Sequence, residues 1–310
     1  MAEIHDLIIR HGKDGARQML PVEDRHLVEQ AAAMLEESDP ALGITYTGFC
    51  LTALPHKKLG DSEVWEQTGH NVSLLIAPGQ IPDKRGKGIT VGVPYGSRAR
   101  LILLYLQTQA VRSSSPEVEL GSSMANWLKR MGITLGGKQY RDVQDQANRI
   151  SACNLTFIWQ NNGSIQHCKD SIIQGGIRFT DPGDNQPRLF EDTVRLSNNF
   201  YKALKEHPVP IAEPALRHIA NISLAIDIYI WLAYRLHSIS PRHPTTITWT
   251  ALHGQFGTGY AKLFHFRPRF IDALKEALAV YPDAKVDITD AGLVLHQSRP
   301  PILEKQYRLV

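Results

Sequence analysis

The chain has 310 residues, of which 43% are hydrophobic and 21% charged, with a net charge of +3, the ordinary balance of a soluble globular protein with room for two domains. No apolar run is long enough to cross a membrane as a helix, and the amino terminus lacks the basic and apolar stretches of a secretory signal. Three cysteines without Cys-x-x-Cys spacing argue against a disulfide framework, so the sequence predicts a cytoplasmic protein with no membrane partner.

Residues 1–44 form an acidic segment in which apolar residues at helical spacing predict helices. The segment holds four Lys or Arg and nine Asp or Glu, a balance of −5, whereas the rest of the chain holds 30 basic and 22 acidic residues, a balance of +8. A basic body favours a polyanionic partner, although many soluble proteins carry a similar excess. The sequence thus predicts a short acidic extension in front of a basic body.

The body begins with strands and continues with an ordered series of elements. Between 44 and 94, glycine, proline and β-branched residues predict strands separated by polar turns. From Ser97 the chain predicts a buried helix, and the segments after it predict strand, helix, turn, helix and hairpin. This order is that of a winged helix, a helix-turn-helix with a β-hairpin beside it. The segments are RARLILLYLQTQAVRS, PEVELG, SSMANWLKRMG, QYRDVQDQANRIS and NLTFIWQNNGSIQHC, the last with its turn at Asn162-Gly163.

The same order of elements recurs about 128 residues later, which indicates an internal repeat. The last helix of the second copy has an apolar stripe at Phe270, Leu274, Ala277, Leu278 and Tyr281. The sequence therefore predicts an α+β fold, with two tandem winged-helix domains behind a short helical N-terminal extension. The segments of the second copy are SLAIDIYIWLAYRLHSIS, TTITW, TALHGQFGTG, RPRFIDALKEALAVY and AKVDITDAGLVLHQS. The predicted boundaries are 1–44 for the extension, 45–190 and 191–302 for the two domains, and 303–310 for a tail.

Residues 132–139 come close to a phosphate-binding loop. Gly132, Gly137 and Lys138 satisfy G-x-x-x-x-G-K, but Gln139 stands where a Ser or Thr hydroxyl must bind Mg²⁺. Such a loop follows a β-strand, whereas a capped helix is predicted before Gly132. No metalloprotease, zinc-finger or nucleophile-elbow motif occurs in the sequence. We therefore interpret the segment as a turn between helices and expect no enzyme activity, cofactor or metal; an ATPase using the Lys138 loop is the less favoured alternative.

Long stretches of the body match one protein family in the same order. They include TALPHKK, VPYGSRARLILLYLQTQAV, MANWLKRMGITLGGKQYRDVQDQANRISACNLTF and HFRPRFIDALKEALAVYPDAKVDI, within residues 45–302. In these stretches the chain resembles the bacterial plasmid replication initiators of the RepA type.

The resemblance implies tandem winged-helix domains that bind directly repeated sequences (iterons) in the double-stranded DNA of a plasmid origin. Such proteins help to melt the adjacent A+T-rich DNA and recruit the host initiator and the replicative helicase. Many also repress their own promoter, often as dimers, while monomers bind the iterons. A dedicated transcriptional repressor with the same fold is the main alternative that the sequence leaves open.

The second predicted domain offers the clearer set of DNA contacts. In a helix-turn-helix the N-terminal residues of the second helix contact base edges in the major groove. Here those residues are Arg267 and Arg269, which flank Pro268 at the predicted first helical position, and no acidic residue precedes them locally. Because arginine can pair bidentately with guanine, we expect both arginines to contact bases, with Lys275 and Lys262 at phosphates.

In the first predicted domain, acidic residues lie among the candidate DNA contacts. Gln and Asn side chains beside the apolar stripe suit adenine. Arg141 and Arg149, however, can also pair with Asp142 and Asp145 on a merely solvated face. We therefore expect the second domain to make most of the base contacts. The residues predicted to contact DNA are Arg267, Arg269, Lys275, Lys262, His265, Lys138, Gln139, Arg141, Gln144, Asn148 and Arg130, with Lys169, Arg178 and Lys285 in the wings.

Overall fold

The chain folds into two compact units in the computed structural model. Ile44–Pro208 forms the central unit, and Met1–Gly43 together with Val209–Val310 forms the terminal unit. The chain passes from one unit to the other within strands β1 (Leu42–Tyr46) and β11 (Pro208–Ala212). None of the helices described is long and apolar enough to span a lipid bilayer. The structure describes residues 3–69, 71–83, 85–133, 136–161, 164–170, 172–174 and 193–302.

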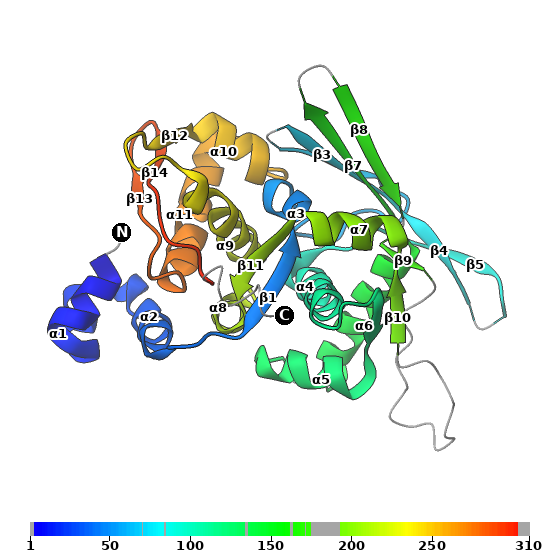
Figure 1. The fold of residues 1–310 in the computed structure, drawn as a ribbon, viewed down its shortest axis with the longest axis horizontal. Helices are drawn as coiled ribbons and strands as arrows, with labels where there is room; N and C mark the ends of the chain where they lie inside the picture. Colours follow the sequence, from blue (N-terminus) through cyan, green and yellow to red (C-terminus); the bar gives the residue numbers. More distant parts are fainter. Residues whose placement is uncertain are drawn as a thin grey trace. The chain divides into compact units, whose positions relative to one another are not determined.

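The terminal unit combines two N-terminal helices with a series of helices closed by a small antiparallel sheet (Figure 1). In this sheet β14 lies between β12 and β13, with Ile247 opposite Leu293 and Val286 opposite Leu295. The elements of the unit are α1 (Glu3–Met19), η1 (Val22–Asp24), α2 (Leu27–Glu36), α8 (Glu213–Ile219), α9 (Ser223–Arg235), η2 (Leu236–Ser238), β12 (Thr245–Thr248), α10 (Trp249–Phe256), α11 (Leu263–Ala279), β13 (Val286–Ile288) and β14 (Gly292–Leu295).

The core of the terminal unit surrounds α9, whose residues 224–233 are all buried. Trp231 of this helix packs edge-on against Phe256 of α10, with ring centroids 5.3 Å apart, and Phe256 lies 5.5 Å from Phe270 of α11. The apolar stripe predicted on the last helix is confirmed, because all five of its residues are buried. A helix that is apolar all round needs neighbours on every side, and α8, α10 and α11 supply them.

Helix α11 begins earlier than the sequence predicted. The predicted start at Pro268 is wrong, because the helix begins at Leu263 and contains the proline. Phe266 explains the additional turn, since it is fully buried and its ring lies 5.2 to 5.8 Å from three other rings. As the sixth residue of α11, Pro268 removes the hydrogen bond that the carbonyl of Phe264 would accept and crowds that carbonyl, a cost that the burial of Phe266 and Phe270 on either side of it offsets.

Hydrogen bonds and an ion pair between polar side chains hold the acidic extension against α11. Asp24 of η1 accepts hydrogen bonds from the ammonium group of Lys275 with both carboxylate oxygens, at 2.7 and 2.9 Å. The neighbouring carboxylate of Glu276 lies 2.8 Å from the ring nitrogen of His26 and 3.0 Å from the amide nitrogen of Gln30. The extension therefore folds as part of the terminal unit, against the C-terminal half of α11.

An apolar contact at the end of α11 completes this packing. Leu27 and Ala31 of α2 form a buried cluster with Ala279, and two isoleucines of α1 pack against it. The buried ring of His5 lies 3.0 Å from the carbonyl oxygen of Ala279, with which it forms a hydrogen bond. Helix α1 is thus held at the carbonyl end of α11 by a histidine inside an otherwise apolar contact.

The central unit combines helices with several small antiparallel sheets (Figure 1). Its strands form a four-stranded sheet in the order β2-β3-β7-β8, a three-stranded sheet in the order β6-β10-β9, and the pair β4-β5. The elements are α3 (Thr47–Leu51), β2 (Trp65–Thr68), β3 (Val72–Ala77), β4 (Gly79–Pro82), β5 (Gly88–Val91), α4 (Gly96–Arg112), β6 (Glu117–Glu119), α5 (Gly121–Arg130), α6 (Gly137–Ala152), β7 (Asn154–Asn161), β8 (Ser164–Asp170), β9 (Ile173–Gln174), β10 (Thr193–Leu196) and α7 (Asn198–Glu206).

The hairpin predicted as the wing of the first domain belongs to another sheet. Strands β7 and β8 do pair, with Phe157 opposite Cys168, but β7 also pairs along β3 in the four-stranded sheet. Phe157 and Leu155 of β7 lie opposite Leu74 and Ile76 of β3, and all four are buried, so β7 extends the apolar face of β3. This hairpin therefore does not pair with β6, the strand before the predicted helix-turn-helix, because β6 pairs with β10 instead.

The two units nevertheless share one arrangement of strands. In the sheet β6-β10-β9, as in the sheet β12-β14-β13, the third strand along the chain lies between the first and the second. Strands β9 and β10 thus occupy the places of β13 and β14, and β7 with β8 forms an insertion before them. The segment 175–192 that joins β9 to β10 lies outside the described residues.

The burial of His5 in α1 predicts that the free energy of unfolding of the terminal unit depends on pH. Burial lowers the pKa of His5 from its usual 6.5, so the folded unit favours the neutral ring. The histidine therefore stabilises the fold above pH 6.5, and this contribution is lost as the pH falls below that value. We expect the free energy of unfolding in urea to fall more steeply between about pH 7.5 and about pH 5.5 for the wild type than for His5→Gln. His265→Gln, at an exposed histidine of the same unit, is the control; equal slopes for wild type and His5→Gln contradict the prediction.

Candidate nucleic-acid interface

The first turn of α11 is an exposed basic end. Lys262 occupies the N-cap position, and it and the next three residues are exposed, whereas Phe266 is buried and anchors the turn. No acidic residue occurs from position 258 to position 271. The turn therefore presents positive charge to solvent without an acidic neighbour in the sequence.

The backbone of this turn adds to its attraction for anions. No side chain caps the first amide groups of α11. The N-terminus of a helix carries a partial positive charge of about half a unit, and its amide groups bind phosphate. Because Lys262 and His265 lie on the same turn, the backbone amide groups and the side chains both favour an anionic ligand such as a phosphate.

Arg267 has partners that were not predicted from the sequence. Its guanidinium group lies 3.3 Å from the carboxylate of Asp290, and its central carbon lies 4.8 Å from the centre of the Trp249 ring. The expectation that no acid pairs with Arg267 is therefore wrong, because its partner lies in the turn between β13 and β14. Trp249 also donates a hydrogen bond to the carbonyl of Thr289 in that turn, at 3.1 Å. Arg267 thus connects the first turn of α11 to the tip of the hairpin.

Arg269 and Lys285 remain available to a ligand. Arg269 is exposed on α11, and none of the residues described forms an ion pair with it. Lys285 is exposed immediately before β13, where its backbone amide donates to the hydroxyl of Ser298 at 3.0 Å. Both residues thus lie at the surface, and Arg269, unlike Arg267, has no acidic partner among the residues described.

Lys275 faces the acidic extension. Its side chain is only 26% exposed and that of Asp24 only 17%, and the two form the ion pair described above. A phosphate contact by Lys275 is therefore not supported, since the lysine already has a carboxylate partner. Nothing in the sequence indicates this pair, because its members are separated by 251 positions.

Helix α6 of the central unit carries the second group of expected contacts. Its N-terminal residues Lys138, Gln139 and Arg141 are exposed, whereas Gln144 and Asn148 are half-buried. Helix α5 ends at Arg130, which is also exposed. The turn that precedes α6 therefore follows a helix, as expected, and lacks the strand that a phosphate-binding loop requires.

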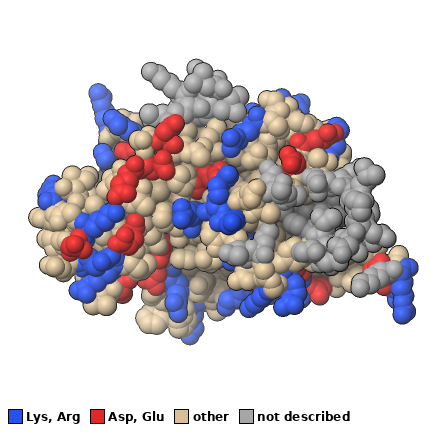
Figure 2. Space-filling model, turned by 90° about the horizontal axis from the view of Figure 1, so that it is seen from below, with Lys and Arg blue, Asp and Glu red and all other residues tan. Residues whose placement is uncertain are grey.

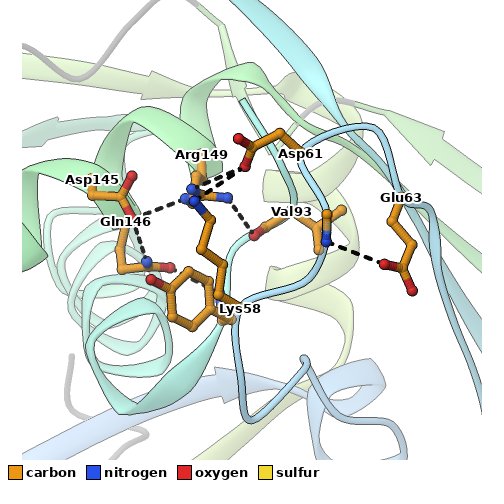
Figure 3. Close-up of polar contacts among 9 residues, drawn as sticks. Lys58, Asp61, Glu63, Val93, Asp145, Gln146 and Arg149 are labelled. Atoms are coloured by element: carbon orange, nitrogen blue, oxygen red, sulfur yellow. Dashed lines mark hydrogen bonds and ion pairs between the residues drawn. The ribbon is translucent and has the colours of Figure 1, made fainter. Parts of the chain in front are cut away.

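Arg149 is a buried structural residue of α6 (Figure 3). It donates a hydrogen bond to the carboxylate of Asp145 at 2.9 Å and lies 3.4 Å from that of Asp61. Its guanidinium carbon lies 5.3 Å from the centre of the Tyr95 ring. Gln146 extends this network, since it accepts from the backbone of Tyr95 at 2.8 Å and donates to Asp145 at 2.9 Å. These contacts fix α6 against two loops of the central unit.

This network predicts that substitution of two arginines of α6 changes the stability of the central unit by different amounts. Arg149→Met removes the buried guanidinium group that binds Asp145 and Asp61 and lies over the Tyr95 ring, so we expect the central unit to lose about 1.5–3 kcal/mol of its free energy of unfolding. The exposed Arg141→Met should change stability by less than about 0.5 kcal/mol. Urea unfolding followed by circular dichroism measures both variants. Comparable losses for the two variants are incompatible with a structural role for Arg149.

Arg100 fixes the start of α4, a role that was not predicted from the sequence. The side chain is buried and donates to the carbonyls of Leu54 at 2.7 Å, Pro55 at 3.2 Å and Gly96 at 2.9 Å. Burial, together with the charge of Arg100, lowers the pKa of His56 to about 3, so this ring is neutral at physiological pH. The sequence does contain a signal for this role, an arginine within an otherwise apolar helix. A charged side chain buried in this way needs hydrogen-bond partners inside the protein.

Two of the expected wing contacts cannot be placed in the interface. Arg178 lies outside the described residues. The backbone of Lys169 lies in β8, paired with Thr156 of β7, and therefore belongs to the four-stranded sheet. Neither residue supports a wing beside α6.

The charged side chains at the surface do not by themselves mark an interface. On the face shown in Figure 2, basic side chains occur at several separate places, many of them with acidic side chains nearby. The local features of α11, an acid-free first turn with uncapped amide groups beside a hairpin, are therefore the better guide to the site.

A family model matches the chain. The model RepA_C, described as plasmid encoded RepA protein, matches residues 93–251, which is just over half of the chain. The chain belongs to the RepA family of plasmid replication initiators. The resemblance stated from the sequence is thereby confirmed. The match extends from the loop before α4 into α10, so it includes Arg100 and α6 and ends before α11 of this RepA protein.

Two crystal structures of RctB are similar to this RepA protein. One, of selenomethionine derivatives of domain 2 and domain 3, is 10% identical with a TM-score of 0.48, and covers 83% of this chain and 99% of its own. The other, of RctB domains 2-3, is 11% identical with a TM-score of 0.39, and covers 79% of this chain and 93% of its own. No curated protein matches the sequence.

Proposed function

We propose that this RepA protein initiates plasmid replication by binding repeated sequences in the origin through two winged-helix domains. The observation that carries the proposal is the exposed first turn of α11, which is basic, has no acidic neighbour in the sequence and lies next to the β13–β14 hairpin through Arg267. An end of this kind suits the negatively charged groove of DNA.

The order of elements in the two units supports the winged-helix assignment. In the terminal unit α9, β12, α10, α11, β13 and β14 follow one another as helix, strand, helix, helix and hairpin. In the central unit α4, β6, α5, α6, β9 and β10 give the same order with the same arrangement of strands, once the β7–β8 insertion is set aside. We therefore propose one DNA-binding domain within each unit.

In the terminal unit α11 enters the major groove with its N-terminal end. Arg269 is the residue best placed to pair with a guanine, since it is exposed and no described residue neutralises it. Lys262 and the uncapped amide groups at the start of α11 bind a phosphate beside the groove. Lys285, next to the hairpin, contacts the phosphate backbone of the DNA. Arg267 holds the hairpin and the first turn in one arrangement, which lowers the entropy lost on binding.

In the central unit α6 makes the smaller contribution. Lys138, Gln139 and Arg141 lie exposed at its N-terminal end, with Asp142 among them. The half-buried positions of Gln144 and Asn148 reduce their reach toward bases. We propose that this domain contacts mainly phosphates and supplies fewer base contacts than α11.

Membership of the family supports the further steps of initiation that we propose for this protein. They are opening of A+T-rich DNA, recruitment of the host initiator and replicative helicase, and repression of the protein's own promoter as a dimer. A dedicated repressor binds DNA in the same way but does not start replication. A plasmid that carries the origin replicates with the protein supplied in trans only if the protein is an initiator.

Selection from a pool of random duplexes tests the DNA-binding proposal directly. The wild-type protein should enrich one motif, and that motif should recur as direct repeats beside the coding sequence. We expect repeats of about 17–22 base pairs, since two recognition helices contact successive major grooves one helical turn apart. Failure to enrich any motif rules out the proposal.

The proposed contacts predict a steep dependence of binding on salt. If two domains neutralise about six to ten phosphates, the logarithm of the affinity should fall with a slope of about −5 to −9 against the logarithm of the salt concentration. Titrations of the selected duplex at several salt concentrations, followed by fluorescence anisotropy, measure the slope. A slope shallower than about −2 means that at most one domain contacts DNA.

The unequal roles of the two helices predict unequal losses on mutation. Arg269→Ala should cost about 1–3 kcal/mol of specific affinity, because one bidentate base contact is lost. Arg141→Ala on α6 should cost less and should weaken selected and random duplexes alike. Mobility shifts on both duplexes, with circular dichroism to confirm folding, make the comparison. A larger specific loss for Arg141→Ala reverses the assignment of the two helices.

A further inference from the structure

Phe264, the second residue of α11, is unusually exposed. Its side chain is 80% exposed, the highest value among the large hydrophobic residues described. Its neighbour Leu263 is 39% exposed, so the apolar surface continues along the turn. An exposed aromatic ring forgoes the free energy that its burial would contribute. Together with Leu263 it forms an exposed apolar surface, of the kind that a binding partner covers.

The helix itself keeps Phe264 on the surface. Phe266, two positions on, points inward and is fully buried. Positions two apart on a helix point about 200° away from each other, so a buried Phe266 requires an outward Phe264. The ring of His265 meets that of Phe264 edge-on, with centroids 5.4 Å apart, and restricts its motion. The ring is thus held outward by the same packing that anchors the turn.

The surroundings of the ring indicate the chemistry of its partner. Lys262 and His265 on the same turn and Arg269 on the next are exposed, and no acidic residue occurs from position 258 to position 271. An apolar side chain within a basic surface fits a polyanion that also offers an apolar group. In the major groove of DNA that group is the C5-methyl of thymine, which phenylalanine contacts in direct readout.

We infer that Phe264 selects thymine, through contact of its ring with the C5-methyl group in the major groove. The inference rests on the proposed function and adds a specificity-determining residue to it. Arg269 distinguishes guanine by hydrogen bonds, whereas Phe264 distinguishes thymine by an apolar contact, so one helix end uses both kinds of recognition.

A cycle of two changes tests the inference. One change is Phe264→Ala, and the other replaces every thymine of the selected duplex by deoxyuridine, which removes the methyl groups and leaves the base pairs intact. Wild-type affinity should fall about fourfold for each methyl group contacted, since each buried carbon contributes a fixed free energy. For Phe264→Ala the same replacement should have no effect, because the contact is already lost. Fluorescence anisotropy with the full-length protein measures the four affinities.

A matched variant at a distant position controls for the loss of exposed apolar surface. Ile9→Ala removes a comparably exposed apolar side chain, 68% exposed, from α1 of the same unit. This variant should retain the wild-type response to deoxyuridine, because Ile9 lies on another helix.

Two outcomes overturn the inference. If Phe264→Ala weakens binding to thymine and deoxyuridine duplexes by the same factor, the ring inserts between bases or serves the fold and does not contact the methyl group. If Phe264→Ala binds both duplexes like the wild type, the ring does not contact DNA, a result that would point to a protein partner. Wild-type binding to the selected duplex tests the proposed function separately, so the two can fail independently.

Discussion

Both units are organised by the burial of one helix that is apolar all round. In α9 residues 224–233 are buried without interruption, and in α4 the same is true of residues 99–108. Such a helix cannot lie on a surface, so the other elements must surround it. The few polar side chains on these helices then need partners inside the protein, and Arg100 meets this need by binding three backbone carbonyls. The position of each outer helix, including the exposed end of α11, follows from this requirement.

The sequence predicted local order well and long-range pairing poorly. Periodicity identified α2, α6 and the stripe of α11, because burial of one face leaves a regular mark on the chain, but it did not identify α7 and α8, and it predicted a strand where α3 forms. It did not show that the β7–β8 hairpin joins β3, since alternating residues suit any sheet with an apolar face. The start of α11 was missed because Pro268 was given the first helical position, although the buried Phe266 required another turn. The partners of Arg267 and Lys275 lie 23 and 251 positions away, beyond the reach of any local rule.

Helix α11 has two ends with opposite surroundings. Its first turn carries exposed basic groups, whereas Lys275 and Glu276 are engaged by the extension. The arrangement explains how an acidic segment with a balance of −5 and a basic surface coexist in one unit. The carboxylate of Asp24 contacts α11 at Lys275, in its second half and about two turns from Arg269, so it does not neutralise the proposed site. The basic site and the contact with the acidic extension therefore lie at opposite ends of one helix, within one unit.

The two units differ in when they can be completed during synthesis. The central unit is one continuous stretch of chain, so all of its residues have left the ribosome before α11 is made. Residues of the extension are translated before the central unit, but several of their partners lie at positions 275–279. Domains generally fold as their chains emerge. The apolar surface that α1 and α2 present to α11 therefore stays uncovered until α11 has been made.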